Sequence, residues 1–228
     1  YVDNRTSLAK RISDEYSRSF TFAKKKQRGF TKIEKIESTS VKSWTRDNYQ
    51  LDNIKIELSE PLKKNEKVVL RIYYTIKLPD SKFTGYGYKN NNFNLKNWLI
   101  VFSKNINGRW LRQSNLNLDD QSTDFSTYKL NFKVSEELKL LSNLKIISEK
   151  NINNQKLYSL EGSDIKEVKV LIEDESSFLM LKNNKFQTQT DIFKLSSITN
   201  TQYNYNRITD FISNYFNDYE SKKLLVLK

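Results

Sequence analysis

Residues 54–78 read IKIELSEPLKKNEKVVLRIYYTIKL, and this stretch decides the fold class of the 228-residue chain. Ile54, Ile56 and Leu58 alternate with charged residues, which is the period of two expected of a strand with one buried face. Pro61 and Asn65 then predict a turn. The alternation returns after the turn, at Val68, Leu70, Ile72, Tyr74, Ile76 and Leu78. We therefore expect the two runs to form an antiparallel pair, each strand with one solvated face.

Similar short apolar runs, separated by Asn, Asp and Gly, occur along most of the chain. They predict strands at about residues 19–23, 30–37, 41–46, 53–59, 66–78, 96–103, 109–112, 126–134, 143–149, 155–160, 165–172 and 177–183, with 186–196 extended. Leu8 and Ile12 lie one helical turn apart, and Thr6 or Ser7 before them predicts a capped helix that runs to about Tyr16. Many short strands favour a mainly β fold, a saddle-shaped antiparallel sheet or a sandwich.

The end of the chain has a different period. Apolar side chains recur every three or four residues at Ile208, Phe211, Ile212, Tyr215, Phe216 and Tyr219, which predicts an amphipathic helix capped by Asn206. Residues 224–227 are then predicted to form a strand. We expect residues 1–174 to form a β domain, and residues 175–228 to form a linker and the strand-helix-strand beginning of a second domain.

A longer pattern spans nearly the whole chain. At its centre a first strand is followed by the segment 60–66, a second strand, Leu78-Pro79, a loop and then Asn97-Trp98. Two matching segments, 4–10 and 20–30, lie before this centre, and two more, 124–128 and 141–143, lie after it. In this order the chain resembles the N-terminal β domain of the bacterial aminopeptidase N-like zinc metallopeptidases, the gluzincins. The resemblance implies that residues 175–228 open a thermolysin-like catalytic domain and that the chain stops before the zinc motif.

The resemblance also implies a function for the parent protein, which is the removal of N-terminal residues from peptides. That family holds zinc with an H-E-x-x-H motif and a further Glu. This chain contains no His, so we expect it to be inactive by itself, with no metal site and no cofactor; zinc is expected in the parent catalytic domain. The β domain would cover the active-site cleft, with the missing catalytic domain and the peptide substrate as its partners.

One residue is matched to the substrate through the resemblance. In much of the family a Gln just before an aromatic-rich strand reaches the N-terminal residue of the peptide, and Asn97 before Trp98 occupies the matching place. Asn97 is therefore a candidate substrate-facing residue, and the alternative is a cap at the start of a strand. Trp98 and Trp110 are expected to pack in the core or between domains, and Met180 in the core.

Composition sets limits on other functions. The chain has no Cys, which excludes disulfides and a Cys nucleophile, and no apolar run long enough for a transmembrane helix. The net charge of +12 raises the possibility of a polyanion partner, and aromatic and basic residues mix at Phe20, Phe22, Lys24, Lys25, Lys26, Arg28 and Phe30. Because acids are scattered among the bases, we expect no nucleic acid partner and expect Phe20 and Phe22 to face the core.

Other clusters have ordinary structural explanations. Asp119, Asp120 and Asp124 lack the spacing of an EF-hand and predict a solvated turn. Glu136-Glu137 predicts surface charge, because adjacent side chains diverge. Gly85-Tyr86-Gly87 lacks the third Gly of a dinucleotide loop and predicts a hairpin loop.

Two functions from different classes remain open. The first is the non-catalytic N-terminal domain of a zinc aminopeptidase, exported to the periplasm, the cell surface or the medium of a bacterium. The second is a non-catalytic β-sandwich module that binds a protein, peptide or glycan. An exposed aromatic patch would favour the second.

Overall fold

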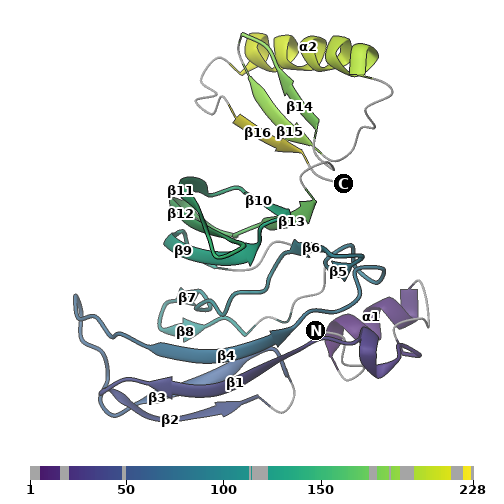
Figure 1. The fold of residues 1–228 in the computed structure, drawn as a ribbon. Coiled ribbons are helices and arrows are strands. Elements are labelled where there is room, and N and C mark those ends of the chain that lie inside the picture. The colour runs from purple at the N-terminus through teal and green to yellow at the C-terminus, as the bar shows by residue number, and fades with distance from the viewer. Residues whose placement is uncertain are drawn as a thin grey trace. The chain divides into compact units, whose positions relative to one another are not determined.

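The structure is a computed structural model that describes residues 6–15, 21–47, 50–112, 114, 123–174, 179–184, 186–190, 198–216 and 223–226 (Figure 1). Within these residues the chain is mainly β, as predicted, with several small and mostly antiparallel sheets and two α-helices. It divides into two compact units, residues 1–128 with 163–169 and residues 129–162 with 170–228. The domain boundary expected after residue 174 stays a prediction.

The predicted N-terminal helix is present as α1 (Ser7–Glu15). Thr6 caps it, because its hydroxyl oxygen accepts the backbone N–H of Ala9 at 3.2 Å. The helix packs through its apolar side on residues from two later segments, and the cluster consists of Leu8, Ala9, Ile12, Ala23 and Phe83. Between α1 and the first strand lies a short 3-10 helix, η1 (Lys25–Gln27).

The first four strands form two separate antiparallel pairs. β1 (Phe30–Glu37) pairs with β4 (Arg71–Lys77), and β2 (Val41–Arg46) pairs with β3 (Ile54–Leu58). The expected pairing of the two runs in residues 54–78 is therefore wrong, although both runs are strands. The alternation itself is confirmed in β4, where Ile72 and Tyr74 are half-buried and Tyr73 is exposed. Alternation determines which face of a strand is buried and does not determine which strand lies beside it.

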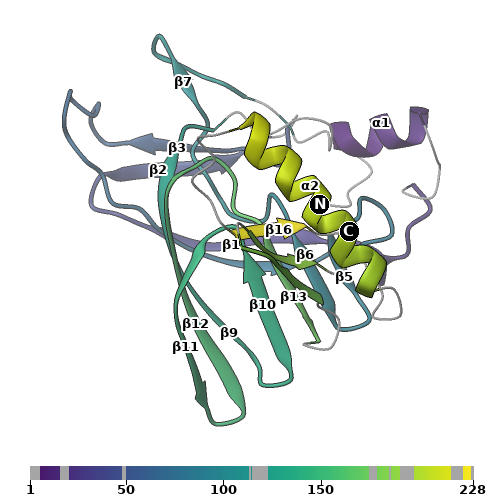
Figure 2. The same cartoon turned by 90° about the horizontal axis from the view of Figure 1, so that it is seen from above.

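Three hairpins are closed by two-residue turns that contain Asn. They join β5 (Gly87–Lys89) to β6 (Asn92–Leu95), β7 (Asn105–Ile106) to β8 (Arg109–Trp110), and β11 (Lys145–Ile152) to β12 (Gln155–Ile165). Both turn residues have positive φ in each hairpin, at Asn90-Asn91, Asn107-Gly108 and Asn153-Asn154. This is the signature of type I′ turns, which match the twist of the paired strands. The segment labelled β7 projects from the rest of its unit in Figure 2.

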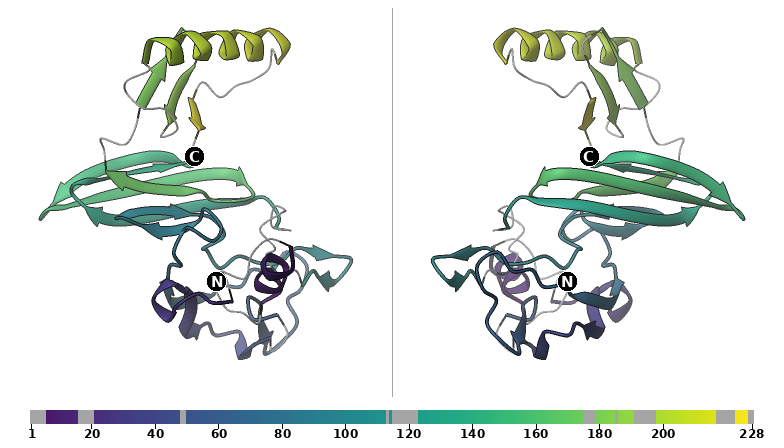
Figure 3. Two further views of the ribbon diagram at one scale, coloured as in Figure 1. Left: turned by 90° about the vertical axis from the view of Figure 1, so that its right-hand side faces the viewer. Right: turned by 90° about the vertical axis from the view of Figure 1, so that its left-hand side faces the viewer.

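The most deeply buried strands lie in the second unit. β10 (Leu138–Ser142) pairs with β13 (Val170–Asp174), and neighbouring residues of both strands are buried. β9 (Ser126–Ser135), β12 and β11 form a three-stranded sheet whose long strands lie side by side in Figure 3. The side chains of β9 alternate between half-buried and exposed as expected. The most completely buried apolar side chains of the described chain are Tyr158, Leu140, Leu160 and Val170.

The C-terminal part of this unit is a small helix-on-sheet layer. β14 (Leu179–Lys182) pairs antiparallel with β15 (Gln187–Thr190), which pairs parallel with β16 (Lys223–Val226). α2 (Ile198–Tyr215) connects β15 to β16 and lies across the strands in Figure 3. A helix between two parallel strands is the crossover that a parallel connection requires.

The structure corrects the predicted helix in two respects. α2 begins at Ile198, so Asn206 lies inside it and does not cap it. Its buried side is formed by Thr201, Tyr205 and Thr209, with Ile212 partly buried. The predicted apolar residues Ile208, Phe211, Tyr215 and Phe216 are exposed, and Tyr219 lies outside the described residues.

The core position expected for Met180 is also wrong. Met180 is about half exposed, whereas the next residue, Leu181, is buried beneath α2 together with Phe186 and Tyr205. Successive side chains of a strand point to opposite faces, so only one of two neighbours in β14 can face the helix.

Candidate functional site

Asn97 lies in a turn and not at the start of a strand. Residues 96–103 are all described and contain no strand, so the strand predicted there is wrong. The backbone of Asn97 has φ 53°, in the left-handed region that Asn adopts more readily than most residues. The chain leaves β6 at Leu95 and changes direction at Asn97. This change of direction interrupts the extended conformation that the apolar run Trp98-Leu99-Ile100 would otherwise favour.

The segment after the turn is attached to β4. The hydroxyl of Tyr74 forms a hydrogen bond with the backbone of Ile100. Burial raises the pKa of Tyr74 above its ordinary value of 10.0, and the hydrogen bond acts in the opposite direction. Tyr74 therefore remains a neutral phenol at physiological pH, and it connects β4 to the irregular segment that follows Asn97.

The residue before Asn97 is held by opposite charge. The carboxylate of Glu167 lies 3.9 Å from the Lys96 ammonium and 3.7 Å from that of Lys169. The side chains of Lys96 and Glu167 are only 17% and 13% exposed, so each charge needs a partner. The Lys96 ammonium also lies 5.2 Å from the centre of the Tyr86 ring, within the range of a cation–π contact. These contacts fix one end of the Asn97 turn.

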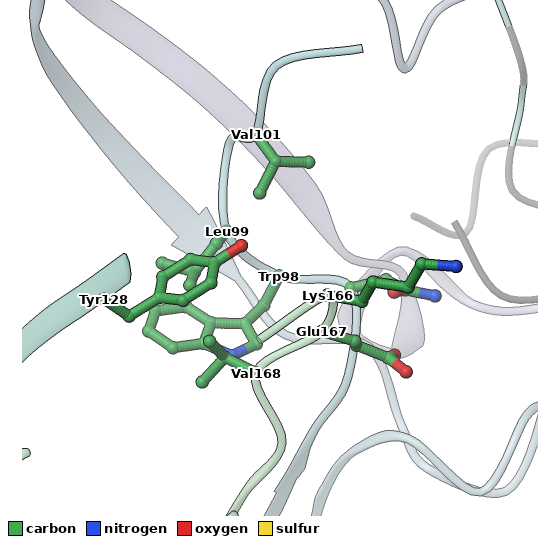
Figure 4. Close-up of a pocket in the computed structure, with 8 residues that line it drawn as sticks. Trp98, Leu99, Val101, Tyr128, Lys166, Glu167 and Val168 are labelled. Atoms are coloured by element: carbon green, nitrogen blue, oxygen red, sulfur yellow. The ribbon is translucent and has the colours of Figure 1, made fainter. Parts of the chain in front are cut away.

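A small pocket lies against this turn (Figure 4). Its apolar side carries Trp98 and Tyr128, and Lys166 and Glu167 point away from these rings. The residues that line it are Asn97, Trp98, Leu99, Val101, Tyr128, Lys166, Glu167 and Val168, all from the first unit. The cavity measures about 10 Å³, which is close to the minimum that holds a single water molecule. It is too small to enclose an amino acid side chain.

The sequence identifies Asn97 and Trp98 but not their neighbours Lys166 and Glu167. The two segments are far apart in the chain, and Lys166-Glu167 lies in a stretch that mixes charged and apolar residues as many solvated segments do. No local pattern distinguishes an acid that pairs with Lys96 from one on the surface. Only the fold brings Glu167 to the turn.

The part of the chain that the structure describes holds no set of zinc ligands. The sequence has no His and no Cys, and the described residues contain no group of three or more Asp or Glu side chains placed to hold a metal. Protein zinc sites use Cys, His and carboxylate ligands in a tight tetrahedral arrangement. The residues present therefore do not fit the zinc that the resemblance implies for the parent protein, and no chemical step through zinc can be assigned to them.

The other candidate clusters have structural roles. Asp124 forms an ion pair with Lys104 at 3.5 Å, and Asp119 and Asp120 lie outside the described residues. Glu136 and Glu137 are exposed in the turn between β9 and β10. Gly85 and Gly87 both have positive φ and form a tight loop in which the Gly85 N–H donates to the carbonyl oxygen of Ser81 at 2.7 Å.

Phe22, expected to face the core, and Trp110, expected to pack in the core or between domains, are both exposed. Packing of Trp110 between domains stays a prediction. Trp110 in β8 is 61% exposed and Phe22 is 74% exposed, whereas Trp98 is half-buried; Phe20 lies outside the described residues. Phe22 lies in a turn, so the strand predicted at residues 19–23 is wrong for the described residues 21–23, and no sheet covers its ring. In the same loop the Arg28 guanidinium donates to the carbonyl oxygens of Ala23 and Thr21, both at 2.9 Å, so this cation stabilises the loop.

No helix within the described residues has the length and the apolar character needed to cross a membrane. No protein-family model matches the chain, and no curated protein matches its sequence.

Proposed function

We propose that this chain is the non-catalytic N-terminal region of a bacterial, exported zinc aminopeptidase of the aminopeptidase N-like family. In this proposal the β region is the saddle-shaped domain that covers the active-site cleft. The segment with α2 begins the thermolysin-like catalytic domain, and zinc belongs to the rest of that domain. The chain by itself hydrolyses nothing.

The observation that carries the proposal is a change of architecture along the chain. The pairs β1–β4, β2–β3, β5–β6, β7–β8, β10–β13 and β11–β12 are antiparallel. β15 and β16 are parallel and are connected through α2. A β region followed by a helix-on-sheet layer is the order that the resemblance predicts. The resemblance of the sequence segments supports the same assignment independently of the fold.

The exposed side of α2 supports the assignment of a further partner domain. Ile208, Phe211 and Tyr215 follow helical spacing on this side, and all three are exposed. The rings of Phe211 and Tyr215 lie 4.4 Å apart and form a continuous aromatic surface. An exposed apolar and aromatic surface often marks a site that another part of the protein or a partner covers. The remainder of the catalytic domain is the partner that this surface fits in the proposal.

Asn97 is the residue of this chain that we assign to the substrate. The cavity beside it is too small for an amino acid side chain, and the side-chain oxygen of Asn97 is buried. In the proposal its amide nitrogen would therefore contact a peptide at the surface of the turn, in a cleft completed by the catalytic domain. Lys96 and Glu167 hold the turn in place before substrate binds, which reduces the entropy lost on binding.

The first experiment is to read the parent gene past the codon for Lys228. We expect a G-x-M-E-N-like segment, then H-E-x-x-H and a downstream Glu. A stop codon or a continuation without zinc ligands would overturn the proposal.

The role of Asn97 is tested in the full-length parent enzyme with Asn97→Gly. Gly accepts the left-handed backbone, so this change removes the amide without straining the turn. We expect KM for peptide substrates to rise by roughly five- to tenfold, the effect of one lost hydrogen bond. The matched control is Asn65→Gly, in a turn with φ 71° that does not line the pocket, and it should leave KM unchanged. Equal kinetics of the two variants would remove Asn97 from the substrate site.

A second candidate function is a binding module for a protein, peptide or glycan, and exposed aromatics favour it. Phe102, Trp110 and Phe125 are all more than half exposed, and Lys166 lies 5.4 Å from the centre of the Phe125 ring. Stacking on such rings is a common mode of ligand binding. Quenching of Trp110 fluorescence by a glycan or peptide library, lost in Trp110→Ala, would support this function. A zinc motif in the parent gene would favour the enzyme.

A further inference from the structure

Asn107-Gly108 is the only Asn-Gly pair in the sequence, and it forms the turn of the β7–β8 hairpin. Residues 105–110 are all exposed, and the turn has φ 50° at Asn107 and φ 80° at Gly108. A Cβ atom placed on Gly108 would have no atom within 4 Å, so no other part of the chain crowds the side of the turn where a side chain would lie. Neither the fold nor the proposed function depends on the Asn107 side chain.

We propose that Asn107 is a site of spontaneous covalent modification. The backbone nitrogen of Gly108 attacks Cγ of Asn107, the bond from Cγ to Nδ2 breaks, and ammonia leaves with the proton that the nitrogen of Gly108 gives up. The five-membered imide is then hydrolysed by water at either of its carbonyls, which gives aspartate or isoaspartate at position 107. No oxidation or reduction takes place, and water is the only co-reactant.

The residue after Asn107 makes this position different from similar turns in the chain. Gly has no side chain to crowd the attacking nitrogen, and its backbone reaches conformations closed to other residues. Asn90 and Asn153 occupy the equivalent turn position with the same φ of 50°, but Asn91 and Asn154 follow them. Asn97 also has positive φ, but Trp98 follows it. The chain therefore contains its own controls for backbone conformation.

In this proposal Asn105 slows the reaction. Its side-chain oxygen accepts the N–H of Gly108 at 3.0 Å, and this hydrogen bond stabilises the neutral N–H form of the backbone amide, which must lose its proton before the nitrogen attacks. Removing the acceptor should therefore accelerate the reaction, although the turn residues themselves are unchanged.

Either product changes the hairpin. The aspartate product places a carboxylate two residues before Arg109 and lowers the net charge of the chain, which is +12. Isoaspartate inserts an extra backbone atom between positions 107 and 108, which is incompatible with a two-residue turn and with the pairing of Ile106 with Arg109. The second product should therefore disrupt the β7–β8 ladder.

The test is peptide mapping by mass spectrometry after the intact chain has been incubated at mildly alkaline pH in heavy-oxygen water. We expect oxygen incorporation at Asn107 to be roughly tenfold faster than at Asn90 or Asn153, because only Asn107 precedes Gly. Conversion at Asn107 no faster than at these two residues would overturn the proposal. The variant Gly108→Ala should abolish the difference between the three turns.

The variant Asn105→Ala tests the part of the proposal that concerns the rate. We expect conversion of Asn107 to be roughly fivefold faster, the factor that corresponds to the loss of one net hydrogen bond. An unchanged rate in a variant whose circular dichroism matches the parent chain would remove Asn105 from the mechanism.

Discussion

The strand pairs β1–β4 and β10–β13 are both antiparallel, but they are buried to different degrees. In β1 and β4 no residue is fully buried, and the side chains that face inward are only half covered. In β10 and β13 adjacent residues such as Leu140 and Leu141 are both buried, which means that both faces of the pair are covered. The free energy of unfolding should therefore depend much more on side chains of β10–β13 than on those of β1–β4. Likewise, buried polar groups should contribute more to stability than exposed polar or charged groups.

The largest effect is expected in β10. Leu140 has no exposed surface, so Leu140→Ala removes a fully buried side chain and leaves a cavity. We expect the free energy of unfolding to fall by about 2–5 kcal/mol, measured by urea unfolding followed by circular dichroism. The matched change Ile72→Ala in β4, at a half-buried position, should cost about 1 kcal/mol. Equal losses in the two variants would show that the contrast between the strand pairs is wrong.

The second largest effect is expected from backbone strain, at a buried glycine compared with one that has open space around it. Gly87 has φ 131° and is buried, and a Cβ atom at this position would overlap the carbonyl oxygen of Pro79. We expect Gly87→Ala to cost about 2–3 kcal/mol, from backbone strain and from displacement of Pro79. Gly85→Ala, with φ 76° and open space around it, should cost only the left-handed strain of about 1 kcal/mol. Thermal melts that rank the two variants in the opposite order would contradict this assignment.

The same contrast explains which strands the sequence predicts well. β1, β2, β3 and β9 lie within a residue or two of their predicted positions, because a strand with one wet face has a clear period of two. β10 is absent from the predicted strands because its run is short and its alternation is broken at Leu140-Leu141, where both faces are covered. Strand partners are also beyond the reach of the sequence, since β3 and β4 follow each other along the chain but belong to different pairs.

The candidate site is also predictable only in part, because the sequence shows local patterns but not contacts between distant segments. The Asn-Trp pair identifies Asn97. The apolar residues after it predict a strand, so the sequence does not reveal the left-handed turn that Asn97 forms. The pairing of Lys96 with Glu167 is not predictable, since it depends on a contact between distant segments. The apolar period predicts the α2 helix, but the polar Thr201 and Thr209 are among its buried residues, which reverses the apolar pattern.

The third prediction concerns these buried polar residues. The hydroxyl of Thr209 is 2.9 Å from the carbonyl oxygen of Tyr205, to which it donates, and it accepts the side-chain amide of Asn183 at 2.6 Å. Thr209→Val keeps the shape but removes both bonds, so we expect a loss of about 1–2 kcal/mol, measured by urea unfolding. Ser213→Ala removes a similar bond, from Ser213 to the Thr209 carbonyl oxygen, at a half-buried position. It should cost less than half as much, and a larger loss would contradict the comparison.

The smallest effect is expected at the exposed face of β2–β3, where the ammonium of Lys42 lies 2.9 Å from the carboxylate of Glu57. The hydrogen bond and the charge of Lys42, with a smaller contribution from Ser43, hold the pKa of Glu57 below its ordinary value of 4.5. Because the pKa is lowered in the folded state, the stabilisation is present above pH 4.5 and is lost as the pH falls through the lower folded-state value. We therefore expect Glu57→Gln to lower the melting temperature slightly at neutral pH and not at all in acid. The difference should also vanish at about 1 M salt, which screens exposed charges. If the melting temperature of Glu57→Gln stayed lower in acid or at high salt, Glu57 would stabilise β2–β3 by packing and not by charge. The solvated face of this pair would then contribute more to stability than its exposure indicates.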